Sequence, residues 1–170
     1  GSMKSLDMEF IQTEATLKNL IYLFARSIDR VDEELMCELF WPDATDDHGL
    51  FTGTAEDYVA WVIPLLKSMN GTQHTISNIL VEVEGDKASA ETYFVAYHQI
   101  GEGDEAIDMV AAGRYFDKFE KRGDEWKFSH RKAVYDWNRN DPATENWSSP
   151  EMKPLLQRGA RKPDDYLYKN

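Results

Sequence analysis

Cysteine is almost absent from this chain of 170 residues, in which Cys37 is the only example. A disulfide framework is therefore excluded, which fits a reducing compartment, and we expect a cytoplasmic protein. Cys37 falls in a helical pattern, where a packed thiol is the ordinary role and a nucleophile the exception. Long hydrophobic runs are also lacking: no stretch approaches transmembrane length, and no signal peptide is visible.

Positive charge is scarce, because 19 Lys and Arg residues face 31 Asp and Glu residues and leave a net charge of −12. This balance argues against nucleic acid and against an anionic membrane as partner. Three signatures are missing as well: a glycine-rich phosphate loop, a serine nucleophile elbow and a dinucleotide fingerprint. We therefore expect no cofactor, no nucleic-acid partner and no membrane partner.

Apolar residues, by contrast, are sufficient for a core. Hydrophobic types make up 42% of the chain, and its length suggests one domain. The 8 Phe, 8 Tyr and 5 Trp residues exceed what a small core needs, so they either pack or line a pocket for a flat ligand. Gly1 and Ser2, which precede Met3, look like the remnant of an expression tag.

Helical periodicity dominates the first part of the chain. Apolar residues recur at three- and four-residue steps over 13–28, which predicts an amphipathic helix. Asp32 is suited to cap a second, short helix, which Pro42 ends. Thr54 is suited to cap a third helix, which Pro64 should kink or shorten.

From residue 75 the pattern changes to long strands joined by hairpin turns. We predict strands at 75–84, 87–100, 106–121 and 125–137. Helices followed by long antiparallel strands indicate an α+β cone, in which a curved sheet wraps around the N-terminal helices. This domain spans residues 1–138. The tail, 139–170, is polar but keeps several apolar residues, so part of it should pack over a pocket or a neighbouring subunit.

Asp29, at the end of the first helix, and His74, at the start of the first long strand, are the most informative pair of residues. In a small cone both could face the same apolar cavity. A carboxylate beside a buried imidazole fixes its tautomer and favours its charged form, which makes a general base without metal or cofactor. The competing interpretations are a solvated acid at a helix end and a hydrogen-bonded core histidine. Tyr22, two turns before Asp29, shares its helix face.

The strands offer further candidates. His74 and Asn78 are four residues apart and so point the same way in a strand, as a pocket wall would require. In the run 90–98, Tyr97 and His98 lie on opposite faces, so one of them, but not both, could be a catalytic donor. One face of this strand should meet the cavity and the other a second subunit.

Two arginines, Arg114 and Arg131, fall within strand patterns, and an arginine buried there needs a carboxylate or a ligand as partner. For Arg114 an ion pair at an edge or interface is the favoured alternative. The run Asp46-Asp47-His48 has three ligand-type residues in a row, but they cannot all converge on one ion, and no second histidine follows at ligand spacing. We therefore expect no metal, with Asp47 and His48 instead at the mouth of the cavity.

Four segments resemble the SnoaL-like branch of the nuclear transport factor 2-like superfamily. They are Ile28-Asp29-Arg30, Phe40-Trp41-Pro42-Asp43-Ala44, His74-Thr75-Ile76-Ser77-Asn78 and Trp126-Lys127-Phe128-Ser129-His130-Arg131. The resemblance covers about residues 13–138. It implies an α+β cone with a deep pocket between helices and sheet, and proton transfer without a cofactor.

Members of this family include scytalone dehydratase, bile-acid 7α-dehydratase, the hexachlorocyclohexane dehydrochlorinase, polyketide cyclases and the diarylpropane lyases that deformylate lignin-derived dimers. In the dehydrochlorinase, a helix-end aspartate and a strand-start histidine form the catalytic dyad, and Asp29 and His74 match those positions. Arg131 matches that enzyme's pocket arginine. The dehydratases carry a tyrosine where this chain has Phe24.

The resemblance implies a lyase acting on a small aromatic or polycyclic hydroxylated compound, with loss of water, or of formaldehyde from a phenolic diarylpropane of the lignin type. An isomerase or cyclase with the same base and a non-catalytic small-molecule binding module are the alternatives. We expect a homo-oligomer, with a trimer favoured over a dimer by the resemblance. The candidate catalytic residues are Asp29, His74, Tyr22 and His98. The candidate substrate contacts are Phe24, Asn78, Tyr97, Arg114, Arg131, His48 and Trp61.

Overall fold

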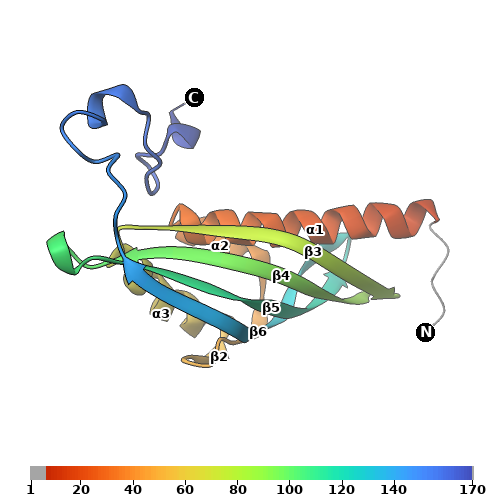
Figure 1. Cartoon of the computed structure of the whole chain (residues 1–170). Helices are drawn as coiled ribbons and strands as arrows, with labels where there is room; N and C mark the ends of the chain where they lie inside the picture. Colours follow the sequence, from red (N-terminus) through yellow and green to blue (C-terminus); the bar gives the residue numbers. More distant parts are fainter. Residues whose placement is uncertain (1–6, 170) are drawn as a thin grey trace.

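The computed structural model of the chain describes residues 7–169, so the tag-like Gly1 and Ser2 lie outside the described residues. The main elements are α1 (Met8–Asp29), α2 (Glu33–Leu39), β1 (Phe40–Asp47), β2 (Thr52–Thr54), α3 (Ala55–Lys67), β3 (Gly71–Glu84), β4 (Lys87–Ile100), β5 (Ile107–Arg122) and β6 (Glu125–Pro142) (Figure 1). Three short 3-10 turns lie at Gly103–Glu105, Lys153–Leu155 and Tyr166–Tyr168. No helix between residues 7 and 169 has the length and apolar character needed to cross a membrane.

The helix starts follow from side-chain caps. Asp32 and Thr54 each accept a hydrogen bond from the backbone N–H three residues on, so both predicted caps are confirmed. α1 begins five residues earlier than the periodicity predicted, because Asp7 caps it in the same way. α3 continues past Pro64 to Lys67, and a kink at Pro64 stays a prediction.

The six strands form one curved, open sheet in the order β2-β1-β6-β5-β4-β3. Every neighbouring pair is antiparallel except β1 and β6, which run parallel. The four long strands were predicted, and the helices-then-strands order gives the expected α+β cone. β1 and β2 were not predicted. α1 lies along the sheet beside β3, while the C-terminal segment stands over the end of α1 (Figure 1).

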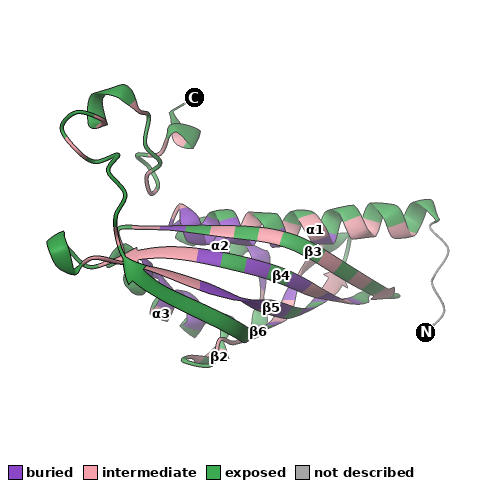
Figure 2. Ribbon diagram, in the orientation of Figure 1, coloured by how far each residue is buried: buried purple, intermediate pink, exposed green. Residues whose placement is uncertain are grey.

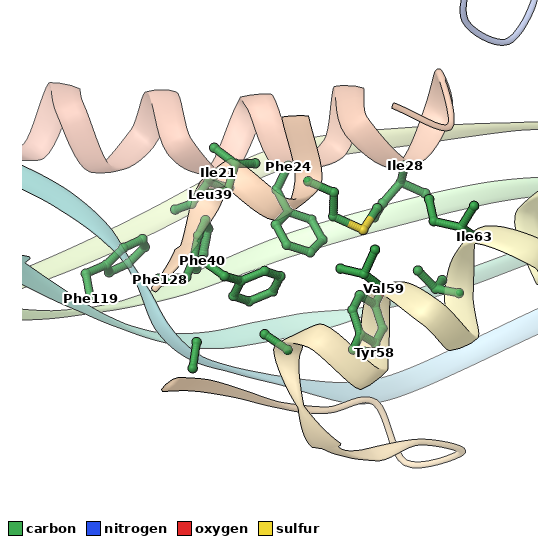
Figure 3. Close-up of a cluster of buried hydrophobic side chains, with 14 of the residues drawn as sticks. Ile21, Phe24, Ile28, Leu39, Phe40, Tyr58, Val59, Ile63, Phe119 and Phe128 are labelled. Atoms are coloured by element: carbon green, nitrogen blue, oxygen red, sulfur yellow. The ribbon is translucent and has the colours of Figure 1, made fainter. Parts of the chain in front are cut away.

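An aromatic cluster fills the space between α1 and the sheet (Figure 3). The Phe24 ring meets Phe40 edge-on at a centroid distance of 5.4 Å and Phe128 at 5.5 Å. Phe119 packs on the far side of Phe128 at 4.6 Å. Four phenylalanines from one helix and three strands therefore fix α1 against the sheet, and with it the position of the helix end.

Burial separates the two faces of β4 (Figure 2). Phe94 and Ala96 are buried on the side of the helices, whereas Tyr93 and Val95 on the outer side are 44% and 43% exposed. The inner face of the sheet therefore carries the even-numbered residues of this strand. An outer face with exposed apolar side chains suits an interface, and the oligomer stays a prediction.

Candidate active site

The end of α1 places the Asp29 carboxylate against the start of β3. Its Oδ1 accepts hydrogen bonds from His74 Nδ1 (2.8 Å) and from Thr72 Oγ1 (3.1 Å), and its Oδ2 accepts one from the His74 backbone N–H (2.8 Å). Asp29 is only 9% exposed. The predicted contact between Asp29 and His74 is thus confirmed, and the alternative of a solvated helix end is wrong. Their catalytic role stays a prediction.

The partner of Nδ1 determines where the His74 ring carries its proton. A carboxylate can only accept, so Nδ1 bears the hydrogen and the neutral ring keeps a lone pair on Nε2. The side chain is 7% exposed. Such a ring can take up a proton at Nε2, and the Asp29 carboxylate stabilises the imidazolium that forms.

A second imidazole, His98 of β4, lies 5.7 Å from the His74 ring between centroids. Its Nδ1 donates to the Met109 carbonyl oxygen (3.2 Å), which leaves its Nε2 as an acceptor. Burial and, next, the neighbouring His74 ring lower the pKa of His98, so the ring is neutral at pH 7. A neutral ring of this tautomer offers Nε2 as an acceptor, and the donor role considered for His98 stays a prediction.

Tyr115 of β5 brings a hydroxyl to the inner face of the sheet. Its ring stacks on Phe94 at 4.2 Å, and the Arg131 guanidinium carbon lies 3.8 Å from its centroid. Burial raises the pKa of Tyr115; the Arg131 charge opposes this, while nearby carboxylates that include Asp29 add to it. The phenol therefore remains protonated at neutral pH and can donate a hydrogen bond.

Small residues form the sheet between these polar groups. Ala96 is the cross-strand partner of His74, and Ala111 is the next partner along the same row. Gly113 follows on β5, where a Cβ would lie 2.1 Å from the Val134 carbonyl oxygen, so only glycine fits. These side chains contribute little volume beside the His74 imidazole.

Arg131 has a carboxylate as its partner, which is one of the two partners predicted for a buried arginine. Its Nε and Nη2 donate to the two carboxylate oxygens of Asp117 at 2.8 and 3.0 Å, and both residues are 1% exposed. The guanidinium also lies over the Phe24 ring at 4.2 Å. Arg131 was also predicted to contact the substrate, but its Nε and Nη2 groups are already bound to Asp117. Phe24, another predicted contact, is fully buried in the core.

Asp46 and His48 form a second carboxylate–imidazole pair, through Asp46 Oδ1 and His48 Nδ1. The His48 ring stacks on Tyr58 at 4.6 Å, with Nε2 3.5 Å from the Tyr58 hydroxyl. Asp47 was expected beside His48 at the cavity mouth, but it pairs with Lys132 (2.7 Å). Asp46 and Asp47 are adjacent in β1 and face opposite ways, and Asp46 is the one that contacts His48. The hydrogen bond from Lys132 is the main reason why the pKa of Asp47 falls to about 2.

Tyr22 and Asn78 are placed away from the site, contrary to prediction. Tyr22 is 49% exposed, because the groups that cover Asp29 belong to the start of β3 and reach only the last turn of α1. Asn78 is exposed because the pairing of β3 with β4 shifts between Ile76 and Ile79. This irregularity interrupts the alternation of faces and returns Ile79, in place of Asn78, to the core.

Tyr97 and Arg114 lie on the outer face of the sheet, so their predicted substrate contacts are wrong. The Tyr97 hydroxyl donates to Asp108 (2.8 Å), and Arg114 pairs with Glu91 (3.1 Å). For Arg114 the ion pair of the alternative is present, but β5 lies inside the sheet and not at its edge, and an interface there stays a prediction. Trp61 stacks on Phe51 (5.6 Å) beside the core, and its substrate contact stays a prediction.

Three residues of the site were missed. Thr72 precedes His74 by two positions, so strand alternation could have found it. Tyr115 precedes Asp117 by two, and a search for the carboxylate that Arg131 needs would have led to that face. Arg161 belongs to the C-terminal tail and donates to the Asp29 backbone carbonyl, and no motif or periodicity around it in the sequence indicates this contact. In residues 7–169, no group of three or more His, Cys, Asp or Glu is arranged to hold a metal ion.

Comparison with known proteins gives one family. The profile of the SnoaL-like domain matches residues 9–132. None of the curated proteins matches the chain.

Several solved structures share the fold. A protein provisionally assigned as a scytalone dehydratase, from Novosphingobium aromaticivorans, is 20% identical with a TM-score of 0.69, over 79% of this chain and 91% of that one. Hexachlorocyclohexane dehydrochlorinase LinA-type3 from Novosphingobium barchaimii is 21% identical with a TM-score of 0.71, over 82% and 97%. A protein of unknown function from Mycobacterium tuberculosis is 19% identical with a TM-score of 0.66, over 91% and 90%.

Proposed function

The chain belongs to the family of SnoaL-like domains, which have the cone fold of the nuclear transport factor 2-like superfamily, and we propose that it is a cofactor-independent lyase. Its substrate is a small, mostly apolar aromatic compound that carries hydroxyl groups. A dehydrochlorinase and a provisionally assigned dehydratase among the structural neighbours support this reaction class.

One observation carries the proposal: His74 Nδ1 is held by the buried Asp29 carboxylate. This leaves Nε2 as the basic atom, next to small side chains of the sheet. A binding module gains nothing from pairing a buried carboxylate with a histidine, since an apolar pocket binds without it. A base positioned in this way typically contributes about 10²–10⁴-fold in rate.

The same base serves two eliminations. In a dehydration, Nε2 takes a proton from carbon, the C–H electrons form a C=C bond, and the neighbouring C–O bond breaks. In a deformylation, Nε2 takes the proton of a primary hydroxyl group, and the carbon that bears this hydroxyl leaves as formaldehyde. The electrons of the broken C–C bond form a C=C bond, and a hydroxyl on the neighbouring carbon departs. In both, the departing hydroxide receives a proton and leaves as water.

For the group that assists this departure we propose Tyr115. Its hydroxyl stays protonated at neutral pH and lies on the inner face of the sheet, within electrostatic reach of Asp29. A protonated phenol stabilises developing negative charge on oxygen by hydrogen bonding. We assign His98 the complementary role, because its Nε2 can accept a hydrogen bond from a substrate hydroxyl.

The aromatic character of the substrate is supported by the side chains around these groups. Phe94 and Tyr115 form a stacked pair beside the site. A planar ring gains from offset or edge contacts with such faces. A phenolic diarylpropane of the lignin type and a smaller aromatic diol both meet these requirements, and an isomerase or cyclase that uses the same base is the alternative reaction.

The experiment is a screen of aromatic diols and phenolic diaryl compounds, followed by ultraviolet absorbance because both eliminations extend conjugation. A hit is a compound that the wild-type protein converts, and the His74→Ala protein, shown by thermal melt to be folded, should fail to convert it. Turnover should survive a chelator, since the base requires no metal. Conversion to an isomer without release of water or formaldehyde would favour the isomerase, and tight binding without conversion would favour the binding module.

A further inference from the structure

Arg161, from the C-terminal segment, reaches the site across 132 positions of sequence. Its Nη1 donates to the Asp29 backbone carbonyl (2.6 Å) and to Thr72 Oγ1 (2.8 Å), and its Nη2 donates to the Leu66 carbonyl (3.1 Å). These acceptors belong to the last turn of α1, the start of β3 and the last turn of α3. One planar guanidinium thus connects the three elements that meet at the candidate dyad.

The chemistry of this contact suits arginine. The Asp29 and Leu66 carbonyls lie at helix ends, which carry the negative end of the helix dipole. Leu66 O also accepts from the Met69 backbone N–H (3.1 Å), so Arg161 adds a second donor there. A guanidinium presents several donors in a fixed plane, so one side chain can satisfy acceptors from different directions. A lysine would bring the charge without the fork.

The segment around Arg161 is attached to the loop that follows Asp29. The Lys162 N–H donates to the Arg30 carbonyl (2.7 Å), and the Arg30 side chain pairs with Asp165 (2.7 Å). Lys162 Nζ pairs in turn with Asp32 (3.2 Å). On the other side of Arg161, the Arg30 guanidinium donates to the Ala160 carbonyl oxygen, so the segment is held on both sides of Arg161.

Arg161 also orders the hydrogen bonds of the dyad. A guanidinium only donates, so Thr72 Oγ1 accepts from Arg161 and keeps its own hydrogen for Asp29 Oδ1, 3.1 Å away. The same Oδ1 accepts from His74 Nδ1. A continuous chain therefore runs from Arg161 through Thr72 and Asp29 to His74.

We propose that Arg161 is a positioning residue for the Asp29–His74 pair, so that the C-terminal segment, which lies beyond the family domain, is a working part of the site. This rests on the proposed function only in so far as the dyad is the catalytic base. The positioning itself can be measured without any substrate.

The test is amide hydrogen exchange by NMR on the full chain, read at the His74 N–H, which donates to Asp29 Oδ2. Arg161→Ala should speed exchange there by about tenfold or more, as loss of a charged hydrogen bond implies. Guanidinium chloride at tens of millimolar should restore protection, and sodium chloride at equal ionic strength should not. Arg158→Ala is the matched control, because Arg158 lies in the same segment and pairs with the exposed Glu145.

Unchanged protection at His74 in Arg161→Ala would overturn the proposal. So would a loss that guanidinium does not reverse, or an equal loss in Arg158→Ala, because Arg161 would then serve only to attach the segment. If Arg161→Ala does not fold, the Arg161→Lys variant is measured in its place. An exchange rate at the His74 N–H between those of the wild type and a Thr72→Val variant supports the proposal. A rate equal to that of the wild type contradicts it.

With a substrate from the screen, Arg161→Ala should lower kcat by about 10- to 100-fold with little change in KM, and guanidinium should recover part of the loss. A fall in affinity with kcat intact would contradict a positioning role. If His74→Ala turns the substrate over normally, the proposed function is wrong. The positioning role of Arg161 is then still decided by the exchange experiment, which uses no substrate.

Discussion

The Asp29 carboxylate accepts two hydrogen bonds from a single residue, His74, one from the backbone N–H and one from Nδ1, each 2.8 Å long. The backbone contact fixes the strand against the helix end, and the ring contact fixes the tautomer. A carboxylate that held only the ring would leave the imidazole free to shift with its strand. The double contact therefore ties the direction of Nε2 to the fold itself.

The first prediction separates catalysis from binding. His74→Ala should reduce turnover of a screened substrate by about 10²–10⁴-fold and leave its affinity nearly unchanged, because apolar burial drives binding. Asp29→Asn should also be severe, since an amide can hold the ring in the wrong tautomer and cannot stabilise its charged form. Steady-state kinetics and equilibrium binding, with thermal melts as control, measure both. Wild-type turnover in both variants would make the pair structural.

Removing one hydroxyl tests the proposed donor. Tyr115→Phe keeps the ring that stacks on Phe94 and loses only the hydrogen bond to the departing oxygen. We expect kcat to fall by about 10²-fold or more, as for removal of a single oxyanion donor, with KM little changed. Tyr97→Phe, on the outer face, is the matched control and should leave kcat unchanged. Equal effects of the two substitutions would exclude the assignment.

The buried ion pair should matter for stability. Arg131→Met leaves the Asp117 carboxylate buried without its partner and should lower the free energy of unfolding by about 3–5 kcal/mol. The double variant Arg131→Met with Asp117→Leu should recover much of that loss, because no unpaired charge remains. Urea unfolding measures each value. Arg114→Met, which removes a half-buried pair on the outer face of the sheet, should cost much less, and a comparable loss there would refute the argument.

Stability should depend on the protonation of His98. Its pKa is lowered in the folded protein, so as pH falls below the unfolded value of about 6.5 the unfolded chain binds a proton that the folded chain does not. Stability is therefore retained above that pH and lost as pH falls toward the lower folded pKa. We expect His98→Gln to reduce the difference in unfolding free energy between pH 7.5 and 5.5. His130→Gln is the control, and an equal reduction there would contradict the prediction.

The outer face of the sheet predicts association. Tyr93 and Val95 of β4 and Phe116 of β5 are exposed there. We propose that a homo-oligomer covers them, with a trimer favoured. Light scattering at micromolar concentration should give a mass above that of one chain, and Val95→Lys should lower it. A monomeric wild type at that concentration would count against the proposal.

Local patterns account for much of the fold. The caps at Asp32 and Thr54 and the four long strands follow from residue chemistry and periodicity. β1 was missed because Pro42 and the acidic residues after it suggest a loop, whereas the strand exists through its parallel pairing with β6. No local pattern contains a partner so distant in the chain.

In the site, too, some residues could be predicted from local sequence and others could not. Asp29 and His74 could be matched as motifs, but the positions of Tyr22 and Asn78 depended on contacts that spacing alone does not specify. A one-residue irregularity in β3 was enough to turn Asn78 outward. Tyr115 and Arg131 faced inward together because their strands are paired in register, which is a property of the sheet.

The order of synthesis gives the Arg161 contact a further consequence. Because a chain is synthesised from its N-terminus, Asp29 is made early. Thr45 of β1 can bond to His130 of β6 only after 85 further residues have been made. Arg161 is made later still, 132 residues after Asp29. Contacts between such distant segments form slowly, because closing long loops is entropically costly. We therefore expect a chain truncated before residue 161 to pair its strands and bring His74 to Asp29 without the Arg161 contact, so that a segment translated later completes a site whose first residues were made early.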